Sequence, residues 1–144
     1  MKKKFIIAIF FLSSVSVFAQ NEATAEKELI KLSNEWMVAA MNRDEKTLNK
    51  IVASEFKLGG TNLDDPSLPR EIWIKNTMEN LKIDSINYNK IKVDIINDVA
   101  IVQSVFYWSV AYLNSPAQKS TVNLIDTWIR RKQGWQVVSR VVVD

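Results

Sequence analysis

The chain contains no cysteine and no histidine, and these two absences remove several kinds of chemistry. Without cysteine there is neither a disulfide framework nor a thiol nucleophile. Without histidine there is no Ser-His-Asp or Cys-His catalytic arrangement, and a transition-metal site is disfavoured. Asp64 and Asp65 lack the oxygen-ligand spacing of a calcium site. The sequence therefore predicts no metal and no cofactor, and leaves carboxylates, lysines, tyrosines and hydroxyls as its chemical groups.

The N-terminal segment has the pattern of a secretory signal peptide. Three lysines at positions 2–4 precede the unbroken apolar run Phe5–Leu12. Val17 and Ala19 place small residues where a signal peptidase reads them, which predicts cleavage before Gln20. The alternative is an uncleaved membrane anchor, although the apolar run is short for one. We expect a signal peptide over residues 1–19 and a periplasmic or secreted protein.

The basic character of the chain comes from this segment. The whole chain has 19 Lys and Arg against 16 Asp and Glu, and three of the lysines lie in residues 1–19. Residues 20–144 therefore carry 16 basic and 16 acidic side chains, so their formal net charge is zero. A balanced charge gives no support to a nucleic-acid partner, or to a membrane partner after cleavage.

Residues 20–144 suit one compact domain, because they contain no internal repeat or long linker. Apolar residues at three- and four-residue spacing predict a first helix over Glu22–Asn42. Asp44 is a natural N-cap for a second helix over Glu45–Val52. Pro69 suits the first turn of a third helix that runs to about Leu81, with Ile72, Trp73, Met78 and Leu81 as its inner contacts.

The pattern then changes to the period of two that is typical of strands. After a brief strand at Glu55–Leu58, alternation begins at Lys90, and Asn97-Asp98 marks a hairpin turn before a long strand from Val99 to about Leu113. Two apolar runs within Ser120–Asp144 predict a final hairpin. The fold expected is α+β, with a cone-shaped, curved antiparallel sheet packed against three N-terminal helices.

The final hairpin carries the most informative residue, Asp126. If Gln133 and Gly134 form a two-residue turn, Asp126 lies opposite Val141, and Trp128 lies opposite Ser139. Asp126 is then a lone carboxylate on an apolar wall, where burial would raise its pKa and suit it to acid/base catalysis. The alternative is a structural carboxylate that accepts hydrogen bonds or pairs with Arg130.

The same register predicts the lining of an interior pocket. Its polar members are Asp126 and Ser139, and the turn-rich segment Thr61–Leu68 lies near its opening. Aromatic side chains supply most of the rest, although aromatics also fill ordinary cores. The residues expected around a small apolar ligand are Trp36, Trp73, Phe106, Trp108, Tyr112, Trp128, Ser139 and Val141.

The opposite face of the sheet is also apolar. A sheet face of this kind, left exposed, usually marks an interface, so we expect a homodimer packed sheet to sheet. The outward residues by this alternation are Val99, Ile101, Val105, Tyr107, Ile125, Ile129, Val138 and Val142.

Four stretches together resemble the SnoaL-like branch of the nuclear-transport-factor-2-like superfamily, in particular its small bacterial domains without assigned function. These stretches are EWMVAAMNRDEKTLNKIVASEF (residues 35–56), REIWIKN (70–76), NDVAIVQS (97–104) and DTWIRRKQGWQVVSR (126–140). The resemblance implies a cone-shaped α+β fold around a pocket, often dimeric through the outer sheet face. Members include isomerases, dehydratases, cyclases and hydrolases that use pocket carboxylates, and others act only in binding or assembly.

One departure from the family pattern bears on function. Relatives often carry a histidine where this chain has Val141, so an Asp–His acid/base pair cannot be transferred to it. Three hypotheses follow. The first is an exported domain that binds a small, largely apolar molecule. The second is a cofactor-free lyase or isomerase in which Asp126 moves a proton. The third is a homodimeric assembly domain with a vestigial pocket.

Overall fold

The computed structural model describes residues 12–62 and 64–143, with side chains from residue 21 onward. The predicted signal peptide lies largely outside these residues, and its cleavage stays a prediction. The helices are α1 (Leu12–Asn42), α2 (Glu45–Ile51) and α3 (Arg70–Glu79). The strands are β1 (Val52–Gly59), β2 (Leu68–Pro69), β3 (Leu81–Ile96), β4 (Val99–Tyr112), β5 (Gln118–Arg131) and β6 (Gly134–Val143).

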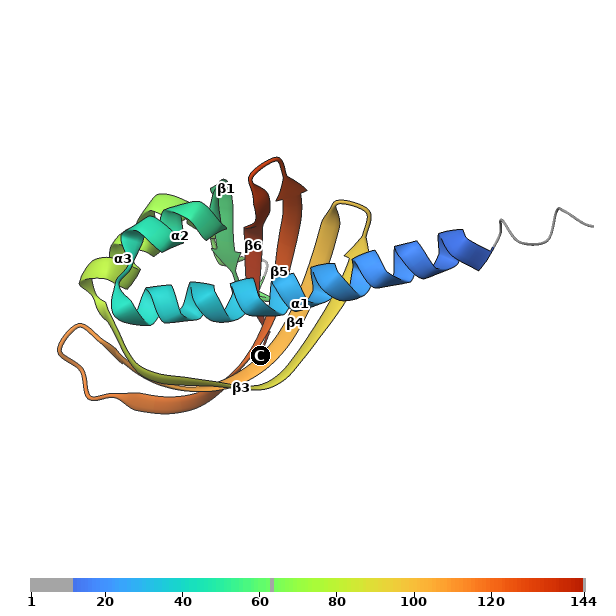
Figure 1. Cartoon of the computed structure of the whole chain (residues 1–144). Helices are drawn as coiled ribbons and strands as arrows, with labels where there is room; N and C mark the ends of the chain where they lie inside the picture. The colour runs from blue at the N-terminus through green and yellow to red at the C-terminus, as the bar shows by residue number, and fades with distance from the viewer. Residues whose placement is uncertain (1–11, 63, 144) are drawn as a thin grey trace, which may run out of the picture.

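The six strands form one curved sheet in the order β2-β1-β6-β5-β4-β3. The three helices lie on its concave side, with α1 crossing the sheet, and no helix of the described residues covers the convex side (Figure 1). The α+β fold is confirmed. The sheet is mixed and not purely antiparallel, because β1 pairs with β6 in the parallel sense.

The second helix begins at its predicted N-cap, whereas Pro69, predicted in the first turn of the third helix, lies just before α3. Asp44 caps α2, since its carboxylate accepts hydrogen bonds from the Thr47 backbone N–H at 3.1 Å and the Thr47 hydroxyl at 2.6 Å. In α3 the prediction that Ile72 faces inward is wrong, because Ile72 is 45% exposed while Ile74 is buried. Residues two apart point to nearly opposite sides of a helix, so only one of these isoleucines can reach the core. Among the described residues, no helix combines the length and apolar character that a membrane span requires.

The hairpin of β3 and β4 has the predicted register. Asn97 takes a positive φ of 56° in the two-residue turn, and Val93 pairs with Val102. β3 is longer than predicted, because it begins at Leu81. Bulges at Asp84 and Asn89 interrupt its alternation, so its first half does not show a period of two.

The predicted register of the final hairpin is wrong. The turn residues are Lys132 and Gln133, and Gly134 follows them with a positive φ of 106° at the start of β6. A bulge then leaves Val138 without a partner, because Thr127 pairs with Ser139 and Trp128 pairs with Val137. Beyond the bulge the faces of β6 are exchanged relative to the prediction. Ser139 and Val141 lie on the convex face, and the concave face carries Arg140 and Val142.

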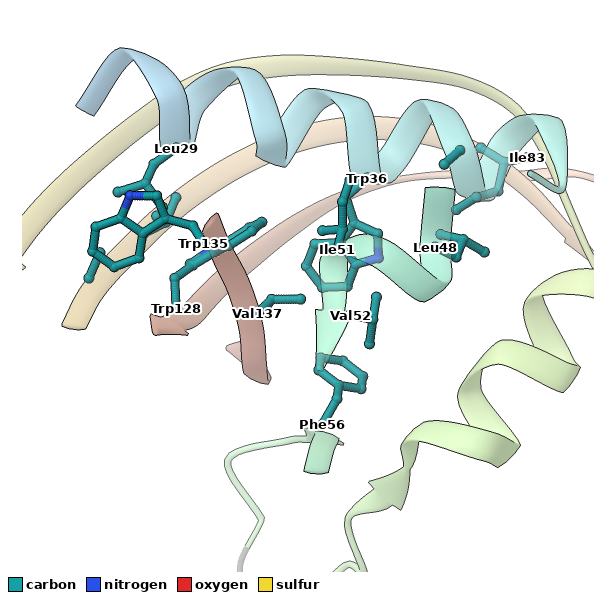
Figure 2. Close-up of a cluster of buried hydrophobic side chains, with 14 residues drawn as sticks. Leu29, Trp36, Leu48, Ile51, Val52, Phe56, Ile83, Trp128, Trp135 and Val137 are labelled. Carbon is teal, nitrogen blue, oxygen red and sulfur yellow. The ribbon is translucent and has the colours of Figure 1, made fainter. Parts of the chain in front are cut away.

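The core lies between α1 and the concave face. Figure 2 shows Leu29 and Trp36 reaching from α1 toward Trp128, Trp135 and Val137 of the final hairpin. Trp36 and Trp128 are completely buried. A second cluster joins Met37 of α1 to Phe106 and Leu124, and Val142 packs against it.

Candidate functional site

Asp126 lies on the concave face of β5 and is 1% exposed. It does not stand alone, because the bulge in β6 brings Arg140 opposite it. The Arg140 Nε donates to Oδ1 at 2.7 Å and Nη2 donates to Oδ2 at 2.8 Å, which is the bidentate geometry of a strong ion pair. The predicted lone carboxylate is therefore half of a buried ion pair.

Three side chains surround the guanidinium. The Trp36 ring lies against it, with 3.7 Å between the ring centroid and Cζ, and Nη1 donates to the Met37 sulfur at 3.1 Å. Tyr88 of β3 completes the group, and its hydroxyl donates to the Ser33 carbonyl of α1 at 3.2 Å. The cluster joins one helix and three strands, so it ties α1 to the middle of the sheet.

Burial and pairing set the ionisation of this cluster. Burial of Arg140 opposes its charge, yet attraction and hydrogen bonds from Asp126 raise the pKa of the guanidinium above its ordinary value. Burial is also the main reason that the pKa of Tyr88 is raised to about 12, and the nearby Asp126 adds to it. Arg140 therefore stays charged and Tyr88 stays neutral across the physiological range.

The predicted pocket residues fall into three groups. Trp36, Trp73 and Trp128 come together with Phe56, with ring centroids 5.6 Å apart for Trp36 and Trp73 and 6.0 Å apart for Trp36 and Trp128. Phe106 and Trp108 meet edge to face at 5.6 Å in the second cluster. Tyr112, at the end of β4, is 50% exposed, and Ser139 and Val141 lie on the convex face.

The sequence did not predict that Arg140, Tyr88 and Met37 would gather around Asp126. The predicted register places Arg140 on the opposite face from Asp126, and Tyr88 precedes Lys90, where the predicted alternation begins. One signal could have found Arg140, because a carboxylate expected on a buried apolar face needs a cation or donor nearby. Arg140 is the basic residue closest to the predicted position opposite Asp126.

Surface hollows lie on both sides of the sheet, and four of them are formed by described residues. They lie between α1 and β3 (about 300 Å³), between α1 and α2 (about 670 Å³), across the middle of the convex face (about 890 Å³) and on the convex face near the β4–β5 turn (about 510 Å³). Asp126 lines none of these four. Within the described residues, no three carboxylates gather closely enough to hold a metal ion.

Comparison with known proteins identifies the fold. No protein-family model and no curated protein matches the chain. Among solved structures, an NTF2-like protein from Cytophaga hutchinsonii is 13% identical with a TM-score of 0.74, over 82% of this chain and 96% of that one. An NTF2-like protein of unknown function in nutrient uptake from Rhodospirillum rubrum is 16% identical with a TM-score of 0.71, over 80% and 96%.

The association domain of C. elegans CaMKII shares the same architecture, at 12% identity and a TM-score of 0.68, over 85% of this chain and 97% of that one. The chain therefore has the NTF2-like fold. The fold implied by the SnoaL-like resemblance is confirmed, and identities this low carry nothing beyond the fold.

Proposed function

We propose that this protein is a self-associating domain whose convex sheet face binds a second copy of the chain. One observation carries the proposal. All three helices lie on the concave side, so an apolar stretch of the convex side is left without cover (Figure 1). We call this stretch the outer patch, and it comprises Val99, Ile101, Val105, Ile125, Ile129 and Val141.

The outer patch spans β4, β5 and β6, with the polar Gln103 and Thr127 between its members. Val99 is paired with Ile129, and Ile125 is paired with Val141, so the patch crosses three neighbouring strands. Val99 is 38% exposed, and the other members are partly exposed. Two copies related by a two-fold axis would bury this surface symmetrically. An association domain occurs among the structures that share the fold.

The arrangement of the concave side favours assembly over the two pocket hypotheses. The Asp126 carboxylate is engaged on both oxygens by Arg140, and Trp36, Phe56, Trp73 and Trp128 pack against one another where the interior ligand was expected. Proton transfer by Asp126 and binding of a small apolar molecule inside the cone stay predictions.

The proposal is tested by measuring the molecular mass of the protein in solution, for wild type and for variants with a charge introduced into the outer patch. Ile101→Glu and Ile129→Lys each place a charge where a partner sheet would bury it, so each variant should be monomeric by light scattering while wild type is dimeric at micromolar concentration. Ile72→Lys is the matched control, because Ile72 is an exposed isoleucine on α3 away from the sheet face.

Unfolding measurements separate lost assembly from lost folding. The two patch variants should keep the wild-type far-ultraviolet circular dichroism, and their Tm should no longer rise with protein concentration as the wild-type Tm does. A monomeric wild type under these conditions would overturn the proposal.

A further inference from the structure

The convex face changes character along β4. As far as Val105 its outward side chains are mainly apolar, whereas the next two outward residues, Tyr107 and Ser109, are polar. Two adjacent rows cross β3, β4 and β5 in this second region. One row is Asn87, Tyr107 and Thr121, and the next is Ser85, Ser109 and Lys119.

These two rows line a hollow of about 510 Å³, together with Trp108 and Ser120. Tyr107 is 51% exposed, so it leaves much of its phenol ring open to a ligand. Ser109 is only 8% exposed, which is unusual for an outward residue near a strand end. The hollow therefore has an aromatic side and a recessed polar floor.

The Ser109 hydroxyl lies at the floor of the hollow. Within the part of the chain that the structure describes, it makes no hydrogen bond to another protein group. The hydroxyl is not among the buried unpartnered atoms of the described residues, so it faces the hollow and can bond to water or to a ligand there.

The lining chemistry selects a class of ligand. It offers hydroxyls, one amide, one phenol and one indole, with Lys119 as the single charge and no carboxylate. One exposed ammonium is too little for a polyanion or a nucleic acid. A ligand that satisfies this lining has a flat apolar face for Tyr107 and a rim of hydroxyls for the side chains around it. A pyranose ring has both, and we propose that this hollow binds a neutral saccharide.

The proposed saccharide site is independent of the proposed dimer. Its rows begin beyond Val105 and Asn123, where the outer patch ends. A monomeric wild type would refute dimerisation and leave saccharide binding testable. Conversely, a dimer that binds no saccharide would refute only the saccharide site.

Saturation-transfer NMR on the folded wild-type protein tests the site with three neutral probes, namely maltotetraose, cellotetraose and N,N′,N″-triacetylchitotriose. At least one should bind with a Kd below about 10 mM, within the range of weak specific recognition. Tyr107→Ala should weaken that binding about tenfold or more, because it removes the stacking surface, while Tyr107→Phe should retain most of it. Ser109→Ala should weaken it several-fold.

Tyr112→Ala is the matched control. Tyr112 is 50% exposed, almost the same as Tyr107, but it lies at the end of β4 and does not line the hollow. Its loss should leave binding unchanged. The proposal is overturned if none of the three probes binds, or if Tyr107→Ala and Tyr112→Ala weaken binding equally.

Discussion

At the scale of single residues, the defining feature is a charge pair that is almost completely buried. The Asp126 and Arg140 side chains are 1% and 6% exposed, and they satisfy each other through two hydrogen bonds. Burying two charges is costly, and a bidentate geometry with further contacts from Trp36 and Met37 offsets this cost. The pair and its contacts join α1 to the sheet. It also occupies both oxygens of Asp126, the carboxylate that the sequence suggested for catalysis.

Removing one partner should destabilise the domain strongly. Arg140→Met leaves Asp126 buried without a cation, and we expect a loss of about 3–5 kcal/mol in the free energy of unfolding by urea. The double variant with Asp126→Leu should recover most of this loss, because no uncompensated charge remains. Lys92→Ala is the control, since it breaks an exposed pair with Asp94 and should change stability by less than about 0.5 kcal/mol. If Arg140→Met alone lowered the free energy of unfolding by as little as the control does, Asp126 would not depend on Arg140 for its burial.

Tyr88 should make the stability depend on pH at the alkaline end. Its pKa is raised to about 12 in the folded protein, above about 10 in an unfolded chain, so its neutral form favours folding. The contribution is complete below pH 10 and is lost as pH rises through about 12. Wild type should therefore lose about 3 kcal/mol more than Tyr88→Phe over this window, measured by urea unfolding at a series of pH values. If the free energy of unfolding fell equally with pH for wild type and Tyr88→Phe, Tyr88 would not be the source of the alkaline loss.

At the scale of elements, the two long hairpins differ in how well their sequences specify register. In the hairpin of β3 and β4, Asn97 takes the positive φ inside a two-residue turn, and counting outward from the turn gives the observed pairs. In the final hairpin, Gly134 takes the positive φ one residue after the turn, and Val138 is an extra residue in β6. A bulge leaves no mark on the alternation of a valine-rich strand, so Arg140 and Ser139 could not be assigned from the pattern.

The conformation of Gly134 gives a direct test of this turn. A Cβ added there meets no atom within 4 Å, so Gly134→Ala should destabilise through its φ of +106° alone, by about 1 kcal/mol. Gly60→Ala is the matched control, because its added Cβ is equally unobstructed and its φ is not positive. The two variants should differ in thermal unfolding by this amount. Equal Tm values would mean that Gly134 is not held in this conformation.

At the scale of the whole molecule, the sequence was sufficient to predict the layers of helices and sheet. It was not sufficient to predict whether the interior between them is open or filled. Helix periodicity, the Asp44 cap and the change to a period of two predict three helices followed by a curved sheet. Whether an interior stays open depends on how side chains such as Trp36 and Trp128 turn, which periodicity does not encode. The parallel pairing of β1 with β6 could not be predicted from the sequence pattern either. Strands that are not neighbours in sequence pair through contacts that no local pattern shows.

That parallel pairing has a consequence for the order in which the molecule assembles. β3, β4, β5 and β6 follow one another through short turns, so each can join its predecessor as a hairpin. β1 reaches the sheet only beside β6, through pairs such as Val52 with Val137 that are about 80 residues apart in the chain. Closing so long a loop is slow relative to hairpin formation. We therefore expect docking of β1 on β6, together with the α2 and α3 that flank β1, to come late and to set the folding rate.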